Sequence, residues 1–294
     1  MEEAVLYAVE NGIATITMNR PKSLNSMNDG LIFGLHAALD KAEADAAVRC
    51  IVLTGAGKAF CAGGDLSYLN GLESIADKKD FIAKVGDVAK RITVIAKPVI
   101  AWVNGVTAGA GVNLMLACDL VYASHKARFG ESFAKVALIP DCGGLYFLPR
   151  AIGLHKAKEL MFTGDLIDAP TAERIGMLNA VVEEEFLKDK VYEIAVRLAV
   201  SAPLAIGLTK KYLNDTALSL DEVLALEETT QSLLMDTEDC KEGIAAFYEK
   251  RPPYKAMYSS PSRLRSKLPS IIFQESRESE QGRRQRQYSA VAPE

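Results

Sequence analysis

The sequence predicts an α/β protein built on a mostly parallel sheet. Three short apolar runs rich in β-branched residues, CIVLTG (50–55), PVIAWV (98–103) and DLVYAS (119–124), have the composition of buried strands. Glycine-rich loops follow the first two runs, and apolar residues at helical spacing follow the loops. Strand, loop and helix units that recur from about residue 48 to 150 are typical of parallel α/β layering.

A hairpin and a helix are expected ahead of this region. The segment VLYAVENGIATITM contains two strand-like runs around Asn11-Gly12, a strong signal for a two-residue turn. Residues 31–42 then carry apolar side chains at helical spacing, at Leu31, Leu35, Ala38, Leu39 and Ala42. A further helix is expected over about residues 77–96, between the first two buried runs.

From about residue 154 onward the pattern is helical. One expected helix places four apolar residues on one face: Leu187, Val191, Ala195 and Leu198. The run SLDE (219–222) is a capping box ahead of the next helix. Asp236 or Thr237 is expected to cap a last helix, which the proline pair at 252–253 ends.

The composition argues against several classes of protein. A net charge of −4 argues against a general nucleic-acid binder. We expect no membrane span, because no run approaches eighteen apolar residues, and no secretory signal, because the start is acidic and lacks an apolar run. Five widely spaced cysteines without a C-x-x-C indicate buried small side chains rather than a disulfide framework or a metal site. The cytoplasm follows as the default location, and an organelle matrix is equally compatible.

The last 36 residues, 259–294, have a different composition. They are rich in Ser, Arg, Gln and Glu, and they carry seven Lys or Arg against four Glu, so this tail is basic on an otherwise acidic protein. The composition predicts a disordered tail with no specific role. The alternative is a tail that contacts RNA or a protein partner.

Two glycine-rich loops, GAGKAFCAGGDL (55–66) and NGVTAGAG (104–111), are candidate binding elements. The first lacks the pattern of a P-loop, and the second lacks the last glycine of the dinucleotide fingerprint. Two N–H groups from separate loops, aimed at one carbonyl oxygen, would form an oxyanion hole. The alternative, that both loops are only tight turns, stays open at this point.

One aspartate raises a similar question. Asp141 lies in ALIPDCGG, behind a proline and among apolar and small residues. A carboxylate in this position is either a turn residue that faces water or a buried acid kept for chemistry.

Five blocks together resemble the signature of the crotonase superfamily, the enoyl-CoA hydratases and isomerases. They are NRPKSLNSMN (19–28), GKAFCAGGDL (57–66), NGVTAGAGVNLMLACDLVYAS (104–124), ARFGESFAKVALIPDCGGLYFLPRAIG (127–153) and EGIAAFYEKRPP (242–253). The resemblance covers about residues 3–256. It implies a spiral of β-β-α units over residues 1–200 and a helical region over 201–258 that packs on neighbouring subunits. A homotrimer, commonly paired into a hexamer, and an acyl-CoA thioester substrate are implied as well, with no cofactor beyond the CoA moiety.

The resemblance also implies roles for individual residues. The oxyanion donors are the backbone amides of Gly64 and Ala110, and removing one such donor typically costs about 10²–10³ in rate. The implied CoA contacts are Lys22, Leu24, Ala62, Asp65 and Leu66, with Phe247 and Lys250 reaching CoA on a neighbouring subunit. Without the resemblance, the two lysines would be ordinary surface residues and Asp65 an ordinary helix N-cap.

The residues that select the reaction indicate an isomerase. Asn113 and Phe133 occupy the positions of the two hydratase glutamates, and neither can activate a water. Glu131 lies two residues before Phe133, which in an extended segment means about 6.6 Å along the strand, so it is not expected to substitute. Asp141 matches the catalytic acid of the enoyl-CoA isomerases, and PDCGG and YFLPR are most similar to the phenylacetate-type isomerases. The only tryptophan, Trp102, is in the wrong place for the dehalogenase group.

A one-base reaction follows from these roles. Asp141 takes a proton from the carbon next to the thioester, the enolate oxygen rests on the two amides, and the proton returns two carbons further on. Leu138 and Phe133, with Asn113, are expected to line the acyl pocket, and its apolar walls to raise the pKa of Asp141. Two alternatives stay open. One is a hydratase or an acyl-CoA hydrolase of the same superfamily, and the other is a non-catalytic protein that binds acyl-CoA, RNA or a partner.

Overall fold

The computed structural model describes residues 3–215 and 217–251. The chain divides into two compact units, the first ending at Val223 and the second beginning at Leu224. The basic tail and the proline pair that was expected to end the last helix lie outside the described residues. The domain boundaries expected at residues 200 and 258 stay predictions.

Ten strands and eleven α-helices are formed by the described residues. The strands are β1 (Val5–Glu10), β2 (Ile13–Met18), β3 (Cys50–Gly55), β4 (Ala59–Cys61), β5 (Val99–Val103), β6 (Val106–Ala108), β7 (Leu120–Ser124), β8 (Arg128–Gly130), β9 (Leu166–Asp168) and β10 (Ala180–Val182). The helices are α1 (Asp29–Ala44), α2 (Leu66–Asn70), α3 (Ile75–Val94), α4 (Ala110–Leu116), α5 (Gly144–Ile152), α6 (Leu154–Thr163), α7 (Ala169–Arg174), α8 (Glu184–Ala199), α9 (Pro203–Asn214), α10 (Leu220–Met235) and α11 (Glu238–Glu249). Two 3-10 helices, η1 (Pro21–Ser23) and η2 (Ser132–Val136), complete the set.

The larger sheet has six strands in the order β1-β2-β3-β5-β7-β10. The predicted hairpin is confirmed, since β1 and β2 pair antiparallel across Asn11 and Gly12, whose positive φ angles of 51° and 77° suit a two-residue turn. All the other neighbours pair in parallel. The prediction of a mostly parallel α/β sheet is therefore confirmed.

The smaller sheet positions the candidate site. Its order is β4-β6-β8-β9, with β4, β6 and β8 parallel and β9 antiparallel to β8. Each of these strands has only three residues. The sequence predicts loops where β4 and β6 form and only helices after residue 154, and these predictions are wrong at β4, β6, β9 and β10. A three-residue strand is too short to show the two-residue alternation that identifies strands.

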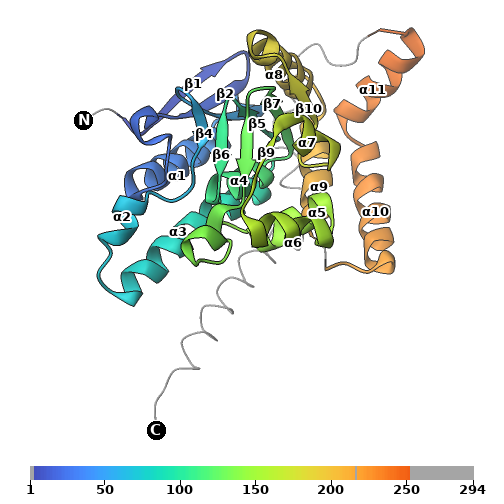
Figure 1. The fold of residues 1–294 in the computed structure, drawn as a ribbon. Helices are drawn as coiled ribbons and strands as arrows, with labels where there is room; N and C mark the ends of the chain where they lie inside the picture. The colour runs from blue at the N-terminus through green and yellow to red at the C-terminus, as the bar shows by residue number, and fades with distance from the viewer. Residues whose placement is uncertain (1–2, 216, 252–294) are drawn as a thin grey trace. The chain divides into compact units, whose positions relative to one another are not determined.

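Helices cover both faces of the larger sheet. On one face, α8 packs across five strands through Leu187, Val191 and Ala195 (Figure 1). A larger apolar cluster on the other face includes the buried residues of α1, α3 and α4. Burial of these side chains supplies the main favourable free energy of folding, roughly 25 cal/mol for each Å² of apolar surface.

Several predicted helix ends are confirmed. The helix expected over residues 77–96 runs from Ile75 to Val94 and begins with a capping box between Ser74 and Asp77. Ser219 and Glu222 form the capping box expected before α10. Of the two candidate caps for the last helix, Thr237 is the one that accepts a hydrogen bond from a backbone amide of α11.

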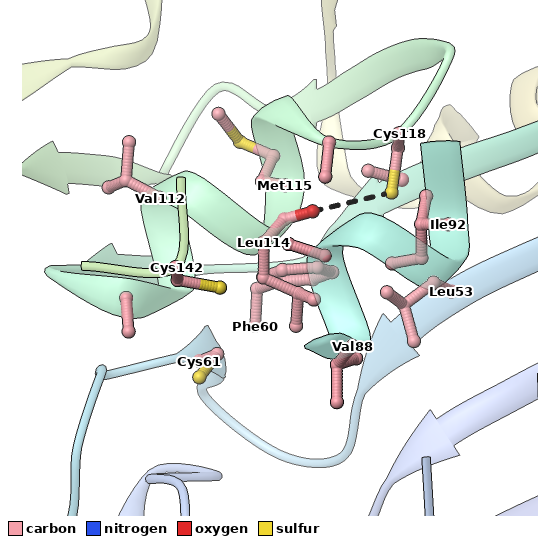
Figure 2. Packing of buried hydrophobic residues seen from close by; sticks show 14 of the residues in the cluster. Leu53, Phe60, Cys61, Val88, Ile92, Val112, Leu114, Met115, Cys118 and Cys142 are labelled. Atoms are coloured by element: carbon pink, nitrogen blue, oxygen red, sulfur yellow. Dashed lines mark hydrogen bonds between the residues drawn. The ribbon is translucent and has the colours of Figure 1, made fainter. Parts of the chain in front are cut away.

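The core beneath the candidate site is built around α4. Figure 2 shows side chains of α4 packed among residues of β4, of α3 and of the turn before α5, with the Cys118 thiol donating to the carbonyl of Leu114 at 3.6 Å. Four of the five cysteines are buried as predicted, and Cys240 is half-buried. Burial raises the pKa of Cys61 to about 12, so this thiol stays uncharged and acts as a small apolar side chain.

The described part of the chain contains neither a single helix that could cross a membrane nor a side-chain cluster that could hold a metal ion. In residues 3–215 and 217–251, no single helix has the length and hydropathy needed to cross a bilayer, and only α8 and α9 taken together, across a 107° bend, meet that test. The same residues contain no group of three or more His, Cys, Asp or Glu side chains that could hold a metal ion.

Candidate active site

The carboxyl ends of three parallel strands meet at one edge of the smaller sheet. Gly64 follows β4, Ala110 follows β6 and Glu131 follows β8 directly. A Cβ atom at Gly63 would lie 2.9 Å from the carbonyl oxygen of Ala108, so the first two loops are in contact. In parallel α/β sheets, ligands bind outside the carboxyl ends of the strands.

The two amides expected to form the oxyanion hole lie on these touching loops. Met27 anchors the backbone on both sides of Gly64. The amide of Met27 donates to the carbonyl of Gly63, and its carbonyl accepts from the amide of Asp65. Among the described residues, neither the amide of Gly64 nor that of Ala110 donates a hydrogen bond to a protein acceptor. Both N–H groups are therefore unused within the described chain, and their role as oxyanion donors stays a prediction.

Glycine is required at two positions next to these amides. Gly63 has a φ angle of 91°, in the left-handed region that other residues rarely adopt. At Gly111 the backbone of α4 presses against β4, because a Cβ atom there would lie 2.1 Å from the carbonyl oxygen of Cys61. The glycines of the two sequence motifs thus bring the loops close together.

Asp141 lies in a tight turn just before α5. The next two residues, Cys142 and Gly143, both have positive φ angles, of 52° and 81°. The side-chain oxygen Oδ1 of Asp141 is buried and has no hydrogen-bond partner among the described residues. Burial raises the pKa of Asp141 to about 6. Asp141 is therefore not a turn residue whose whole carboxyl group faces water.

Asn113 holds the turn that carries Asp141. This side chain is fully buried on α4, and its amide nitrogen donates to the carbonyl oxygen of Asp141 at 2.9 Å. The amide of Gly144 donates to the same oxygen at 2.9 Å. A Cβ atom at Gly144 would lie 2.3 Å from the Asn113 side chain, so the two segments are in close contact. The sequence placed Asn113 in the acyl pocket, and its contact with Asp141 was not foreseen.

Phe133 and Leu138 differ in exposure. Phe133 is buried, and its ring would lie 3.6 Å from a Cβ atom at Gly109, next to the second loop. Leu138, expected in the apolar wall around Asp141, is 52% exposed in the single chain. Their place in an acyl pocket stays a prediction.

Glu131 is a site residue whose position the sequence reading misjudged. The extended geometry assumed for residues 131–133 is wrong, because Ser132 begins the 3-10 helix η2. Glu131 is only 1% exposed, and neither carboxyl oxygen has a hydrogen-bond partner among the described residues. Burial, together with the charge on Asp141, raises the pKa of Glu131 to about 8, although the nearby amide of Asn113 lowers it. One feature of the chain indicates a site role for Glu131. It directly follows the short strand β8, which lies in the same sheet as β4 and β6, the strands that precede the two glycine-rich loops.

The residues expected to contact CoA form two groups. In the first, the amide of Ala62 donates to the carbonyl of Leu24 at 3.0 Å, so the loop after β4 meets the loop after η1. Lys22, Leu24 and Leu66 are exposed there and can reach a ligand. Phe247 and Lys250 lie in the second unit, at the end of α11, and both are exposed. All of these contacts stay predictions.

Asp65 has a structural role in this group. Its carboxylate caps α2 by accepting from the amide of Tyr68, and it forms an ion pair with Arg20 at 2.9 Å. Burial acts to raise the pKa of Asp65, but the hydrogen bonds and the charge of Arg20 outweigh it and hold the pKa below its usual value. Asp65 therefore has the N-cap role that it would have without the resemblance, and its ion pair with Arg20 is not evident from the sequence.

Comparisons with known proteins agree with this geometry. Residues 8–256 match the family model described as enoyl-CoA hydratase/isomerase. The 1,2-epoxyphenylacetyl-CoA isomerase of Escherichia coli (strain K12) is 40% identical over 258 residues, which covers 86% of this chain and 98% of that protein. The short-chain-enoyl-CoA hydratase of Clostridium acetobutylicum is 37% identical, covering 84% of this chain and 95% of that protein.

Solved structures give the same result at the level of the fold. The crystal structure of enoyl-CoA hydratase from Bacillus anthracis matches with a TM-score of 0.82 and 34% identity, covering 86% of this chain and all of that one. A putative enoyl-CoA hydratase from Streptomyces coelicolor A3(2) matches with a TM-score of 0.81 and 38% identity, covering 85% of this chain and 93% of that one. The chain therefore has the crotonase fold and belongs to the enoyl-CoA hydratase/isomerase family.

Proposed function

We propose that this enzyme is an acyl-CoA isomerase that shifts a carbon–carbon double bond, or isomerises a ring acyl-CoA, by one-base proton transfer. The observation that carries the proposal is the half-buried carboxyl of Asp141, which has one buried oxygen without a partner among the described residues and a pKa raised to about 6 by burial. A base with a pKa near the operating pH combines the correct protonation state with a useful driving force.

The reaction needs one acid and two amides. The ionised carboxyl of Asp141 takes a proton from the carbon next to the thioester, and the electron pair of the broken C–H bond moves to the thioester oxygen. The amides of Gly64 and Ala110 stabilise the resulting enolate oxygen. Asp141 then returns the same proton two carbons further on, so the atoms balance and no co-reactant is consumed.

The similar proteins include both isomerases and hydratases. The Escherichia coli relative is an isomerase of an acyl-CoA, and the Clostridium acetobutylicum relative is a hydratase. In this chain Asn113 and Phe133 stand where hydratases carry glutamates, and this favours isomerisation. Hydration is the second candidate because Glu131 gives the pocket a second carboxyl beside Asp141, and water addition uses two such groups.

Turnover of two substrates separates these candidates. An isomerase converts a 3-enoyl-CoA into its conjugated isomer and leaves crotonyl-CoA unchanged, whereas a hydratase adds water to crotonyl-CoA and bleaches the absorbance of the conjugated thioester. We expect the first result, with ring acyl-CoA thioesters included in the panel. Rapid bleaching of crotonyl-CoA with no double-bond shift would contradict the proposal, and absence of all turnover would favour a non-catalytic acyl-CoA-binding protein.

We also propose that the working form is a homotrimer or a dimer of trimers. Phe247 and Lys250 would then approach CoA bound to a neighbouring subunit. Their exposure in the single chain supports this assignment. The tail over residues 259–294 remains a candidate contact for RNA or a partner, and it lies outside the described residues.

A further inference from the structure

Glu131 is a buried carboxyl group that the one-base reaction does not use. It is 1% exposed, and both of its side-chain oxygens lack a hydrogen-bond partner among the described residues. Acidic side chains are almost never fully buried unless they are paired, because an unpaired buried charge costs several kcal/mol. A burial of this kind in a candidate active site indicates a role beyond packing.

The backbone ties Glu131 to the loop of a proposed oxyanion donor. Gly130 ends β8, and its carbonyl oxygen accepts a hydrogen bond from the amide of Gly109 at 2.8 Å. Gly109 immediately precedes Ala110, and Gly130 immediately precedes Glu131. Glu131 is therefore next in the chain to Gly130, whose hydrogen bond with Gly109 holds the second glycine-rich loop.

The side chain of Asn113 connects Glu131 to Asp141. Its amide nitrogen donates one hydrogen bond to the carbonyl of Asp141, and the amide lies near enough to the Glu131 carboxyl to lower its pKa without meeting the geometry of a hydrogen bond. The amide oxygen of Asn113 is buried and has no donor among the described residues. Contact with Gly144 leaves the Asn113 side chain little room to move.

We propose that Glu131 is a positioning residue that acts on Asp141 through the Asn113 amide, supporting the base while Glu131 is uncharged and disturbing it once Glu131 ionises. The inference rests on the proposed function in one respect, namely that Asp141 is the base. An uncharged Glu131 carries an O–H donor, and the buried Oδ1 atoms of Asn113 and Asp141 have no donor among the described residues.

The electrostatics agree with this arrangement. Burial and the nearby charge of Asp141 raise the pKa of Glu131 to about 8, so the group is uncharged at pH 7. Among the described residues, Cys142 is a titratable neighbour of both carboxyl groups, and Cys61 and Cys118 lie near Cys142 in turn. Burial holds the pKa of all three thiols above its usual value, so they stay uncharged. Above pH 8, Glu131 therefore adds a second negative charge beside Asp141, where like charges are costly.

The pH dependence of kcat/KM for isomerisation tests the inference. We expect the wild type to gain activity as the pH rises through about 6, where Asp141 ionises, and to lose it above about 8, where Glu131 ionises. Glu131→Gln cannot ionise, so its profile should keep the lower limb and lack the fall above pH 8. Glu193→Gln, which changes an exposed ion pair with Lys190, is the matched control and should keep both limbs.

The size of the loss separates positioning from simple packing. Glu131→Ala removes both the donor and the contact with Asn113, and we expect kcat to fall by about 100-fold with KM changed by less than about 3-fold. Glu131→Gln should recover most of this loss, because its amide can still donate. An alkaline fall that persists in Glu131→Gln, or a Glu131→Ala variant with wild-type kcat, would overturn the inference.

An activity-independent measurement separates this inference from the proposed function. The infrared C=O stretch of a protonated carboxyl should be present at pH 7, disappear above about pH 8 and be absent in Glu131→Gln. In Asp141→Asn the midpoint should move to lower pH, because the charge that helps to raise it is gone. If the band behaves in this way but no acyl-CoA is turned over, the proposed function fails and the coupling stands. If the carboxyl band is missing at pH 7, or if its midpoint pH does not fall in Asp141→Asn, the inference fails, even when the enzyme converts acyl-CoA substrates.

Discussion

At the scale of single residues, two carboxyl groups have pKa values well above those of acids on the protein surface. Burial raises the pKa of Asp141 to about 6 and that of Glu131 to about 8, far enough apart for one to be ionised and the other protonated at pH 7. Pairs of acids whose environments separate their pKa values in this way can take different roles in one reaction. Burial raises both pKa values, and the charge of Asp141 raises that of Glu131 further.

The burial of Asp141 should reduce stability at high pH. Its pKa in the folded chain lies above that of an unfolded chain, so the folded state binds the proton more tightly. The free energy of unfolding is therefore highest below about pH 4 for this group and falls as the pH rises through about 6, by at most about 3 kcal/mol. Asp141→Asn lacks this loss. Urea unfolding at pH 5 and pH 8 measures it, and an equal pH dependence in both proteins would contradict the assignment.

At the scale of elements, the contact between α4 and β4 controls the distance between the two glycine loops. Gly111→Ala places a methyl group 2.1 Å from the carbonyl oxygen of Cys61, so the helix must move. We expect a loss of about 1–3 kcal/mol in stability and about 10²-fold in kcat, because the proposed oxyanion donor shifts with the helix. Gly86→Ala on α3, where a Cβ meets nothing within 4 Å, is the control and should be neutral or slightly stabilising. Equal behaviour of the two variants in unfolding and turnover assays would refute this.

An ion pair between the buried Lys210 and the partly exposed Asp119 fixes α9 against the ends of two sheet strands. The ammonium of Lys210 donates to Asp119 at 2.7 Å and to the carbonyl of Lys97 at 3.1 Å, and Asp119 also accepts from the amide of Val99. Burial lowers the pKa of Lys210 and raises that of Asp119, and their attraction opposes both shifts.

Breaking this pair should destabilise the enzyme. Lys210→Met leaves the partly buried carboxylate of Asp119 without its cation, and we expect a loss of about 1–3 kcal/mol in chemical unfolding. The double variant Lys210→Met/Asp119→Asn should recover part of the loss because no charge is then stranded. If the double variant is no more stable than the single one, the stranded charge is not the cause.

At the scale of the whole molecule, the sequence predicted the larger elements and the family but not the contacts within the site. Long buried runs such as residues 50–55 and long amphipathic helices show a clear period, so the parallel sheet was predictable. The smaller sheet was missed because its strands have three residues each. The family resemblance predicts a catalytic role for Asp141, whereas the burial of Glu131 depends on the turn into η2, which local composition does not specify.

Association of the chain is a prediction at the same scale. Large apolar side chains of the first unit, including Ile139, Phe162 and Leu213, are each at least 73% exposed in the single chain, which is typical of surfaces covered by a partner. We expect analytical ultracentrifugation to give a trimer of the 31.8 kDa chain, about 95 kDa, or twice that mass. A single species at the mass of the monomer at micromolar concentration would contradict it.

The central claim is that Asp141 is the base of an acyl-CoA isomerase. The most direct measurement compares kcat of wild type and Asp141→Asn for the 3-enoyl-CoA or ring acyl-CoA that the wild type converts fastest. We predict a loss of about 10²–10⁴ in kcat, the usual contribution of a general base, with acyl-CoA affinity retained. A kcat close to that of the wild type would show that another group moves the proton.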